Sequence, residues 1–427
     1  MIKKILRKLV IWCLELEARL ILKKYRPRLV GITGSVGKTS VKEAVYLILA
    51  GRFKTARSEK SFNGEIGVPL SILRRPNAWG RPLDWLKNFA AGLNLIIFRH
   101  DYPEWLVLEL GVDRPGDIKR FNRWLKLDLA ILTGLPARPV HLEFFPSPED
   151  LAKEKLSLFE AVRADGWLVV NGDDERIITP TNYKVVTYGF GENNVIRIHS
   201  EHLIYDDAGP VGYTFKIDHA GHTVPLRLNG LFGRHQLYAP AAGLAVGVAL
   251  GFNLVEMTEA LTAYEPPPGR LRLLRGIKDS LLLDDSYNSS PAAVELALET
   301  LKLINVSGRR IAVLGDMLEL GQYTIEAHQE VGRQAAAVCD IIMTIGVRAK
   351  FIADAARNNG FDPKNLFHFD EAQEAGRALE HLLAPGDLVL VKGSQSIRTE
   401  RVVEEVMAEP ERKTELLVRQ EKEWQER

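Results

Sequence analysis

The strongest constraint on the fold is a glycine-rich segment near the start of the chain, Gly31–Ser40 (GITGSVGKTS). It overlaps the apolar run Leu29–Thr33, which predicts a buried strand, and leads into Lys38–Ala50, whose apolar spacing predicts a helix. Glycines let backbone N–H groups close around phosphate oxygens, and a helix N-terminus adds partial positive charge. The segment therefore predicts a strand–loop–helix unit that binds nucleotide phosphates. The residues expected there are Gly34, Ser35, Val36, Gly37, Lys38, Thr39 and Ser40.

Two side chains of this loop have specific expected roles. Lys38 can reach the outer phosphates, and the Thr39 hydroxyl can ligate Mg²⁺. The strict spacing G-x-x-x-x-G-K-[ST] requires glycine at position 32, where this chain has Ile32. Because Gly37-Lys38-Thr39 is intact, nucleotide binding remains the prediction, with a loop retained only for folding as the alternative.

Short apolar runs alternate with helical stretches along the first half of the chain. Runs at 105–110, 127–133 and 167–171 predict buried strands, and the stretch 148–164 predicts a helix. This alternation is typical of an α/β fold with a mostly parallel sheet and helices on both faces. Residues 184–230 have shorter alternating segments with turn residues, which predict a small antiparallel patch.

Three prolines at 266–268 stiffen the chain and predict a domain boundary, after which a second α/β series begins. Its strands are predicted at 281–285, 311–315, 341–346, 365–369 and 387–392. The expected organisation is a basic amphipathic helix at 1–27, a central nucleotide-binding domain at 28–265, a hinge at 266–270, a Rossmann-like domain at 271–408 and a charged tail at 409–427.

Charge and cysteine content limit the partners and the compartment. The net charge of +1 lacks the strong positive charge typical of proteins that bind nucleic acid, so no nucleic-acid partner is expected. Cys13 and Cys339 are the two cysteines in 427 residues, and they do not make a disulfide framework. A reducing cytoplasm is the predicted compartment.

The first 28 residues carry nine Lys or Arg against Glu15 and Glu17, with apolar residues at helical spacing. No stretch reaches the roughly 18–20 uncharged residues that span a bilayer. The helix at 1–26 is therefore expected either to attach to the inner face of a membrane or to pack on its own domain. The apolar stretch Leu83–Phe98 is interpreted as a buried helix, with a second membrane-facing or partner-facing element as the alternative.

Two polar residues follow predicted strands of the first domain. Glu109 ends one strand, and His141 follows the strand that ends at Thr133. Open α/β sheets bind ligands at the carboxyl ends of their strands. Either residue alone is more often a structural hydrogen-bonding group, but with Lys38 and Thr39 they could complete a metal–phosphate site.

These residues carry a resemblance to the Mur ligase family. The glycine-rich loop, Glu109-Leu-Gly111, the stretch 141–145 with Lys155, and Asn171-Gly-Asp-Asp174 resemble its central motifs. Beyond the hinge, LDDSYNSSP at 283–291, VLGDMLELG at 313–321 with His328, and LVKGS at 390–394 resemble one branch of it. That branch adds D-alanyl-D-alanine to a UDP-muramoyl tripeptide. The similarity covers roughly residues 28–408.

The resemblance implies a monomeric, cytoplasmic, ATP-dependent amide ligase of cell-wall precursor synthesis. Such enzymes phosphorylate a substrate carboxylate to an acyl phosphate, which an incoming amine attacks. ATP, two Mg²⁺ ions, a peptide–sugar substrate and an amino-acid or dipeptide amine are therefore the expected cofactors and partners. The demand on the protein is to neutralise phosphate charge and to position two reactants.

The resemblance also implies roles for individual residues. Lys38 contacts the phosphates, Thr39 and Glu109 hold one Mg²⁺, and His141 helps to hold a second. Lys155 matches a lysine that the family carbamylates into a metal ligand, with an ordinary helix lysine as the alternative. The remaining implied residues are His235, Arg270 and Asn288 at the nucleotide, Asp285 closing over the site, and Asn63, Lys392, Gly393 and Ser394 at the substrate.

The chain departs from the family pattern at several positions, which are Gly64, Gly134, Gln236, Ala239 and Gln395. Gln236 and Ala239 replace asparagines that lie near adenine, so altered adenine recognition is expected. Family members usually carry a separate N-terminal domain that grips the UDP-sugar, whereas about 28 residues precede the loop here. This predicts a substrate held in another way. The alternatives are a lipid-linked or non-muramoyl substrate, and a non-catalytic nucleotide-binding scaffold at the membrane.

Overall fold

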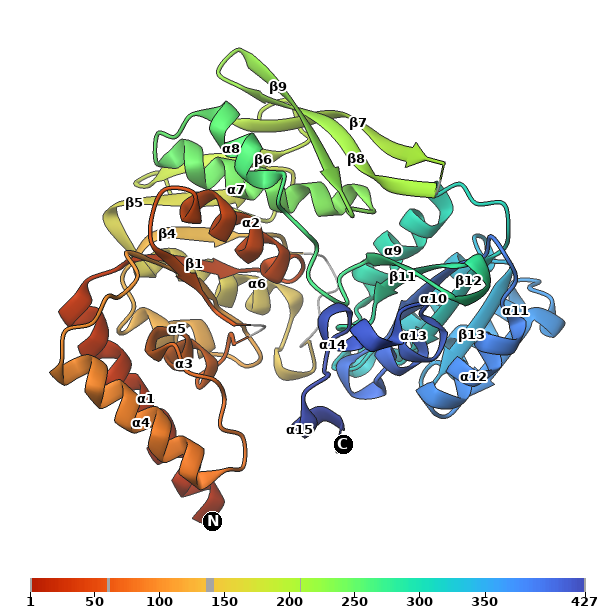
Figure 1. Ribbon diagram of the computed structural model, residues 1–427, viewed down its shortest axis with the longest axis horizontal. Helices are drawn as coiled ribbons and strands as arrows, with labels where there is room; N and C mark the ends of the chain where they lie inside the picture. Colours follow the sequence, from red (N-terminus) through yellow and green to blue (C-terminus); the bar gives the residue numbers. More distant parts are fainter. Residues whose placement is uncertain (1, 60–61, 136–141, 208, 426–427) are drawn as a thin grey trace.

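The computed structural model describes residues 2–59, 62–135, 142–207 and 209–425, which form two α/β units (Figure 1). The central unit contains a nine-stranded sheet with the strand order β2-β3-β1-β4-β5-β6-β7-β8-β9. The C-terminal unit contains a six-stranded sheet with the order β10-β11-β15-β12-β13-β14. Each sheet is covered by helices on both faces, which confirms the predicted α/β class.

The central sheet is parallel from β2 to β7 and antiparallel from β7 to β9. Its strands are β1 (Arg28–Thr33), β2 (Thr55–Arg57), β3 (Trp105–Glu109), β4 (Leu127–Leu132), β5 (Val162–Asn171), β6 (Lys184–Gly189), β7 (Ile196–Asp206), β8 (Gly209–His219) and β9 (His222–Asn229). The mostly parallel sheet is thus confirmed. The antiparallel patch is smaller than predicted, because β6 pairs in parallel with β5.

Two layers of helices enclose the central sheet. One layer contains α2 (Lys38–Ala50), α7 (Tyr238–Ala249) and α8 (Leu254–Leu261). The other contains α1 (Ile2–Tyr25), α3 (Gly67–Leu73), α5 (Asp117–Asn122) and α6 (Pro148–Leu156). The helix predicted at 148–164 ends early, because Val162 already pairs with Leu127 of β4 as the first residue of β5. Its last turn continues only as a 3-10 turn, Ser157–Ala161.

The C-terminal sheet is parallel except at β10, which pairs antiparallel with β11. Its strands are β10 (Arg272–Arg275), β11 (Leu281–Asp285), β12 (Arg310–Gly315), β13 (Ile341–Ile345), β14 (Leu366–Phe369) and β15 (Leu388–Lys392). Helices α9 (Pro291–Leu303), α10 (Thr324–Ala336) and α11 (Lys350–Asn358) cover one face, and α12 (Ala372–Leu382) and α13 (Glu400–Val406) cover the other.

The C-terminal residues pack on the protein instead of extending as a frayed tail. After α13 the chain forms α14 (Lys413–Leu416) and α15 (Lys422–Gln425), and Figure 1 shows α15 between the two units. Arg419 is buried and donates to Glu400 Oε2 at 2.7 Å. Glu423 pairs with Arg81 of the central unit at 2.5 Å, so this segment connects both units.

Helix α1 has one buried face and one exposed face. Leu14, Ala18 and Ile21 are fully buried in the core of the central unit, so the helix packs on its own domain. The outward face is apolar, and its exposed residues are Ile5, Leu6, Leu9, Trp12, Leu16 and Leu20. Within the described ranges, no helix is both long enough and apolar enough to cross a membrane.

Helix α4 (Pro82–Ile97) lies beside α1 and was expected to be buried (Figure 1). That expectation is wrong, because Asn88 and Gly92 are the residues of α4 that are buried. The exposed apolar residues of α4 and its C-cap are Leu83, Leu86, Leu93, Ile97 and Phe98. Helix α4 therefore packs on the protein with one face and turns an apolar stripe on another face toward solvent.

Glu17 is buried where α1 meets α4. A Cβ added to Gly92 would lie 2.2 Å from Glu17 Oε2, so only glycine allows this approach. Burial raises the pKa of Glu17 to about 7. The folded state therefore holds the proton more tightly than the unfolded state does. Stability contributed by the neutral form is full below about pH 4.5 and is lost as the pH rises through 7.

We expect Glu17→Gln to raise the free energy of unfolding by about 2–3 kcal/mol at pH 8 and to change it little at pH 4. The amide cannot ionise, so it avoids the cost of placing a carboxylate between the helices. Denaturant unfolding followed by tryptophan fluorescence at both pH values measures the difference. An equal effect at pH 4 and pH 8 would show that Glu17 does not titrate between them.

Candidate nucleotide and ligation site

The glycine-rich loop lies at the carboxyl end of β1, between β3 and β4. Gly34 has φ +141°, and a Cβ there would lie 2.0 Å from Thr133 Oγ1, so only glycine fits. Thr133 follows β4, and its hydroxyl donates to Val36 O at 2.6 Å. The neighbouring strand end thus holds the loop open around the N-terminus of α2. This is the arrangement that binds phosphate through backbone N–H groups.

Glu109, at the end of β3, lies next to the loop. The Thr39 hydroxyl donates to Glu109 Oε2 at 3.1 Å, and the Asn63 amide donates to Glu109 Oε1 at 3.0 Å. Glu109 is 1% exposed, so the carboxylate is fixed at the base of the loop. Asn63 was predicted to contact substrate, and the structure places it against this carboxylate.

The hydroxyl and carboxylate at the base of the loop fit a magnesium ion. Mg²⁺ prefers oxygen ligands and usually takes one or two carboxylates together with substrate phosphates and water. Thr39 Oγ1 and Glu109 Oε2 would hold such an ion beside the phosphates. Across the described parts of the chain, no three His, Cys, Asp or Glu side chains gather as an all-protein metal cage. His141, predicted for a second ion, lies outside the described residues.

Two lysines form hydrogen bonds with the loop. Lys38 Nζ donates to Gly34 O at 2.9 Å, and Lys155 Nζ, from α6, donates to Ser35 Oγ at 2.6 Å. Lys155 is 2% exposed, and its pKa is held well below its usual value by burial and then by the charge of Lys38. Burial also lowers the pKa of Lys38, against the attraction of Glu109. Two lysine side chains are therefore held beside the phosphate loop, with Lys155 buried and Lys38 half-buried.

Arg270 reaches the loop from the hinge. Its Nη2 lies 3.4 Å from Thr39 Oγ1, and its guanidinium lies 3.9 Å from the centre of the Tyr287 ring. Its Nε is buried and has no hydrogen-bond partner, which leaves a donor for a further acceptor. The segment between the two units thus brings a cation to the loop. Tyr287 was missed as a site residue, although it lies within the DDSYN stretch.

Asp285 and Lys392 form a buried pair at the ends of β11 and β15. Their charged atoms are 2.6 Å apart, and Lys392 Nζ also donates to Asn288 O at 2.8 Å. Burial raises the pKa of Asp285 and lowers that of Lys392, while their mutual attraction opposes both shifts. The charge of Arg270 lowers the pKa of both groups as well, so the pair lies within reach of the hinge cation.

The other predicted residues of the C-terminal unit have structural contacts. Ser394 Oγ accepts from Leu318 N at 2.9 Å, and Ser394 N donates to Asp316 O at 3.0 Å. Gly393 packs on Gly315, whose Cα lies 3.3 Å from a Cβ added to Gly393. These residues therefore hold the loop that follows β12.

The residues that follow Gly233 do not present a free amide. Gln236 Nε2 donates to Arg270 O at 2.8 Å, which ties this position to the hinge. Ala239 is buried in the core and offers no polar atom. Burial and the charge of Lys392 lower the pKa of His235 to about 4, so its ring is neutral at pH 7. The altered adenine recognition expected at Gln236 and Ala239 stays a prediction.

An aromatic cluster at the same sheet edge was not anticipated from the sequence. The rings of Phe190 and Tyr238 meet edge to face at 5.1 Å, and Arg234 lies 3.6 Å from the centre of the Phe190 ring. Asp173 accepts from the Phe190 and Gly191 backbone N–H groups. Asp173 lies in the quoted Asn171–Asp174 motif, but the sequence did not show that it anchors aromatic residues.

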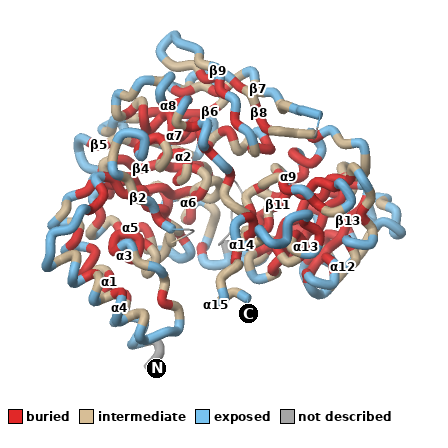
Figure 2. The backbone as a smooth tube through the Cα atoms, viewed as in Figure 1, coloured by how far each residue is buried: buried red, intermediate tan, exposed pale blue. Residues whose placement is uncertain are grey.

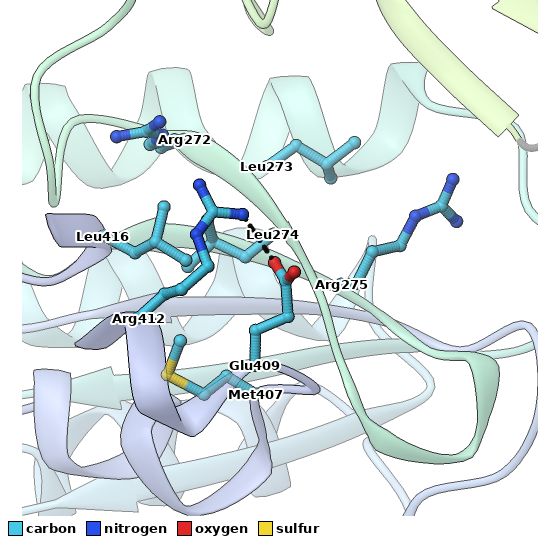
Figure 3. A pocket seen from close by; sticks show the side chains of 8 residues that line it. All are labelled: Arg272, Leu273, Leu274, Arg275, Met407, Glu409, Arg412 and Leu416. Carbon is cyan, nitrogen blue, oxygen red and sulfur yellow. Dashed lines mark hydrogen bonds and ion pairs between the residues drawn. The ribbon is translucent and has the colours of Figure 1, made fainter.

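A surface pocket in the C-terminal unit is lined by none of these residues. It has a volume of about 220 Å³ in the C-terminal unit, and an ion pair between Arg412 and Glu409 crosses its lining (Figure 3). Its lining residues are Arg272, Leu273, Leu274, Arg275, Met407, Glu409, Arg412 and Leu416. Because it contains no predicted site residue and no phosphate-binding loop, we assign the chemistry to the loop region instead.

The sequence and the fold are both similar to those of known proteins. The model of the Mur ligase middle domain matches residues 32–247, and that of the Mur ligase glutamate ligase domain matches residues 269–395. The UDP-N-acetylmuramoyl-tripeptide–D-alanyl-D-alanine ligase of Bacillus subtilis is 25% identical over 398 residues, which cover 93% of this chain and 79% of that protein. Its counterpart in Escherichia coli is 28% identical over 384 residues, covering 88% and 76%.

A solved structure has the same fold. The MurF ligase from Thermotoga maritima, determined in complex with ADP, has a TM-score of 0.74 and 26% identity, covering 93% of this chain and 83% of that one. A folylpolyglutamate synthase from Mycobacterium tuberculosis, at 16% identity and a TM-score of 0.63, shares the fold alone. With both domain models matched in order on either side of the hinge, the chain belongs to the Mur ligase family of ATP-dependent ligases.

Proposed function

We propose that this protein is an ATP-dependent amide ligase of cell-wall precursor synthesis that joins D-alanyl-D-alanine to a muramoyl tripeptide. The observation that carries the proposal is the convergence of Lys38, Glu109 and Arg270 on one phosphate-binding loop. The names of the relatives support the choice of substrates.

In the proposed reaction, a substrate carboxylate attacks the γ-phosphorus of ATP, giving an acyl phosphate and ADP. The amine then attacks the acyl carbon, and inorganic phosphate leaves with the electrons of the broken C–O bond while the amine loses a proton. Lys38 and the loop N–H groups would neutralise the phosphates, and Arg270 would add a cation from the hinge. Charge that is already in place before the reaction is usually the main source of rate enhancement in such catalysis.

Magnesium would neutralise phosphate charge and orient the transferring group. We propose that Thr39 and Glu109 hold one ion, and that His141 and a carbamylated Lys155 help to hold a second. A carbamate forms from a neutral amine and CO₂, and the lowered pKa of Lys155 supplies that neutral form. The carbamate would also replace the repulsion between Lys155 and Lys38 with an attraction.

A second candidate is the same chemistry on a lipid-linked acyl substrate. The exposed apolar face of α1, within residues 1–26, favours it, because this face would place the central unit against a membrane that carries such a substrate. The protein would then work as a peripheral enzyme at the inner face of the membrane.

The decisive experiment measures phosphate release and product mass with ATP and Mg²⁺. The acyl substrates are UDP-muramoyl tripeptide and its lipid-linked counterpart, and the amines are a panel of amino acids and D-dipeptides. We expect release only when a carboxyl substrate and D-alanyl-D-alanine are both present. Turnover of the lipid-linked substrate, without turnover of UDP-muramoyl tripeptide, would select the second candidate. No release in any combination would contradict both and favour a nucleotide-binding scaffold.

A further inference from the structure

Exposed apolar side chains are concentrated on one pair of helices. Of the nineteen large apolar residues that are exposed in the described chain, eleven belong to α1, α4 and Phe98. We call this set the α1–α4 surface; it consists of the exposed apolar residues given above for the two helices. Figures 1 and 2 show α1 and α4 side by side at the edge of the central unit, and Figure 2 shows exposed residues along both. Single exposed apolar residues are ordinary, but a contiguous group marks an interaction site.

Each helix presents its apolar residues as a stripe. On α1, Leu9, Trp12, Leu16 and Leu20 recur every three or four positions, opposite the buried face that contains Leu14. On α4, a matching stripe runs from Leu83 to Ile97. Trp12 is 60% exposed and Leu83 is 72% exposed, so neither is covered by the protein itself. An apolar stripe opposite the packed face is characteristic of a helix that lies in an interface.

Two of the three acidic residues of α1 and α4 are turned away from solvent. Glu15 turns inward and pairs with Arg120 at 2.6 Å, and Glu17 is buried against Gly92. The third, Asp84, stays partly exposed and pairs with Lys87 at 2.9 Å.

Basic groups remain exposed beside the apolar stripes. Lys8, Lys23 and Lys24 of α1 are exposed. Lys87 of α4 is exposed as well, but Asp84 offsets its charge. Lys24 also donates to Leu95 O at 3.0 Å, which joins the end of α1 to the end of α4. The surface therefore offers apolar contact area and positive charge together.

We propose that the α1–α4 surface docks on an anionic lipid bilayer, with both helices lying in the plane of the interface. Buried apolar area and clustered basic side chains are the two contributions that bind such helices to anionic membranes. A second copy fits less well, because a two-fold contact would bring the same basic groups together. The inference extends the lipid-linked candidate by naming the docking surface and its partner, but docking does not depend on which substrate is used.

Vesicle flotation of the full chain tests the proposal. We expect the protein to float with phosphatidylcholine vesicles that contain phosphatidylglycerol about tenfold better than with phosphatidylcholine alone, and less at high salt. Leu9→Glu and Leu93→Glu should each lower binding about tenfold, because each places a charge within the apolar stripe. Ile178→Glu and Val347→Glu are matched controls, since those side chains are 76% and 71% exposed elsewhere, and they should bind normally.

The same variants should retain the phosphate release of the native protein when no vesicles are present. This separates the docking proposal from the proposed function. If the native protein released no phosphate in solution, the proposed function would be contradicted and the docking proposal would not. Absence of flotation with anionic vesicles, equal binding to neutral vesicles, or equal loss in the two controls would overturn docking. A concentration-dependent dimer that Leu93→Glu dissociates would assign the surface to a second copy instead.

Discussion

Lys38→Ala is expected to reduce ATP-dependent product formation by at least about a hundredfold. Lys38 is the cation at the first turn of α2, and its Nζ lies over the loop through its bond to Gly34 O. Because phosphate charge grows toward the leaving group, losing this cation should lower kcat more than it raises KM for ATP. Product mass and phosphate release measured at saturating ATP test the prediction.

The fold should survive this change. Lys38 makes its hydrogen bond to a carbonyl within the loop, and removing a lysine whose pKa is lowered by burial also removes a desolvation cost. The melting temperature should therefore stay close to that of the native protein. Lys153→Ala is the control, since the Lys153 side chain is 78% exposed on α6. A Lys38→Ala variant with near-normal kcat would remove the loop lysine from the mechanism.

Lys155→Ala is expected to lower ligation by about a hundredfold or more, and short carboxylates should restore part of it. If Lys155 carries a carbamate, its metal ligand is an anionic oxygen, and formate or acetate can occupy the space left by the truncated side chain. An unmodified lysine would supply a hydrogen-bond donor to Ser35, which no carboxylate can replace. Activity measured against carboxylate concentration, with an intact-mass spectrum of the native protein, distinguishes the two.

Lys153→Ala is again the matched control, because it removes the same side chain from the same helix without touching the loop. It should keep full activity and show no response to carboxylates. Rescue of Lys155→Ala that also appears for Lys38→Ala would indicate a general effect of anions rather than a replaced ligand. Failure of rescue together with an unmodified native mass would establish the plain lysine.

Much of the scaffold follows from local sequence signals. The loop at 31–40 and its flanking strand and helix were predictable because glycine spacing and apolar periodicity are local properties of the chain. The parallel direction of most strands in both sheets followed from the alternation of strands and helices, since a helix between two strands returns the chain so that the strands run in the same direction. Strand β10 gave no comparable signal, because four residues that pair antiparallel at a sheet edge have too little periodicity.

Other parts of the site depended on contacts between distant residues. Asn63 was assigned to substrate, but its amide faces Glu109, 46 positions away in the chain. Gln236 stood out only as a departure from the family pattern, and the fold shows its amide holding the hinge at Arg270. The stretch at 83–98 is apolar enough to suggest burial. Helix α4 nevertheless contacts α1 and the core with only one face, so its other apolar stripe is exposed.

The loop and the strands that flank it were thus determined by the sequence itself, because backbone freedom at glycine and apolar periodicity act over a few residues. Tertiary structure alone decided which polar groups meet. Lys153 and Lys155 are two positions apart and lie on different sides of α6, since each residue turns a helix by about 100°. Only packing against the loop leaves Lys155 buried beside Ser35 and Lys153 in solvent.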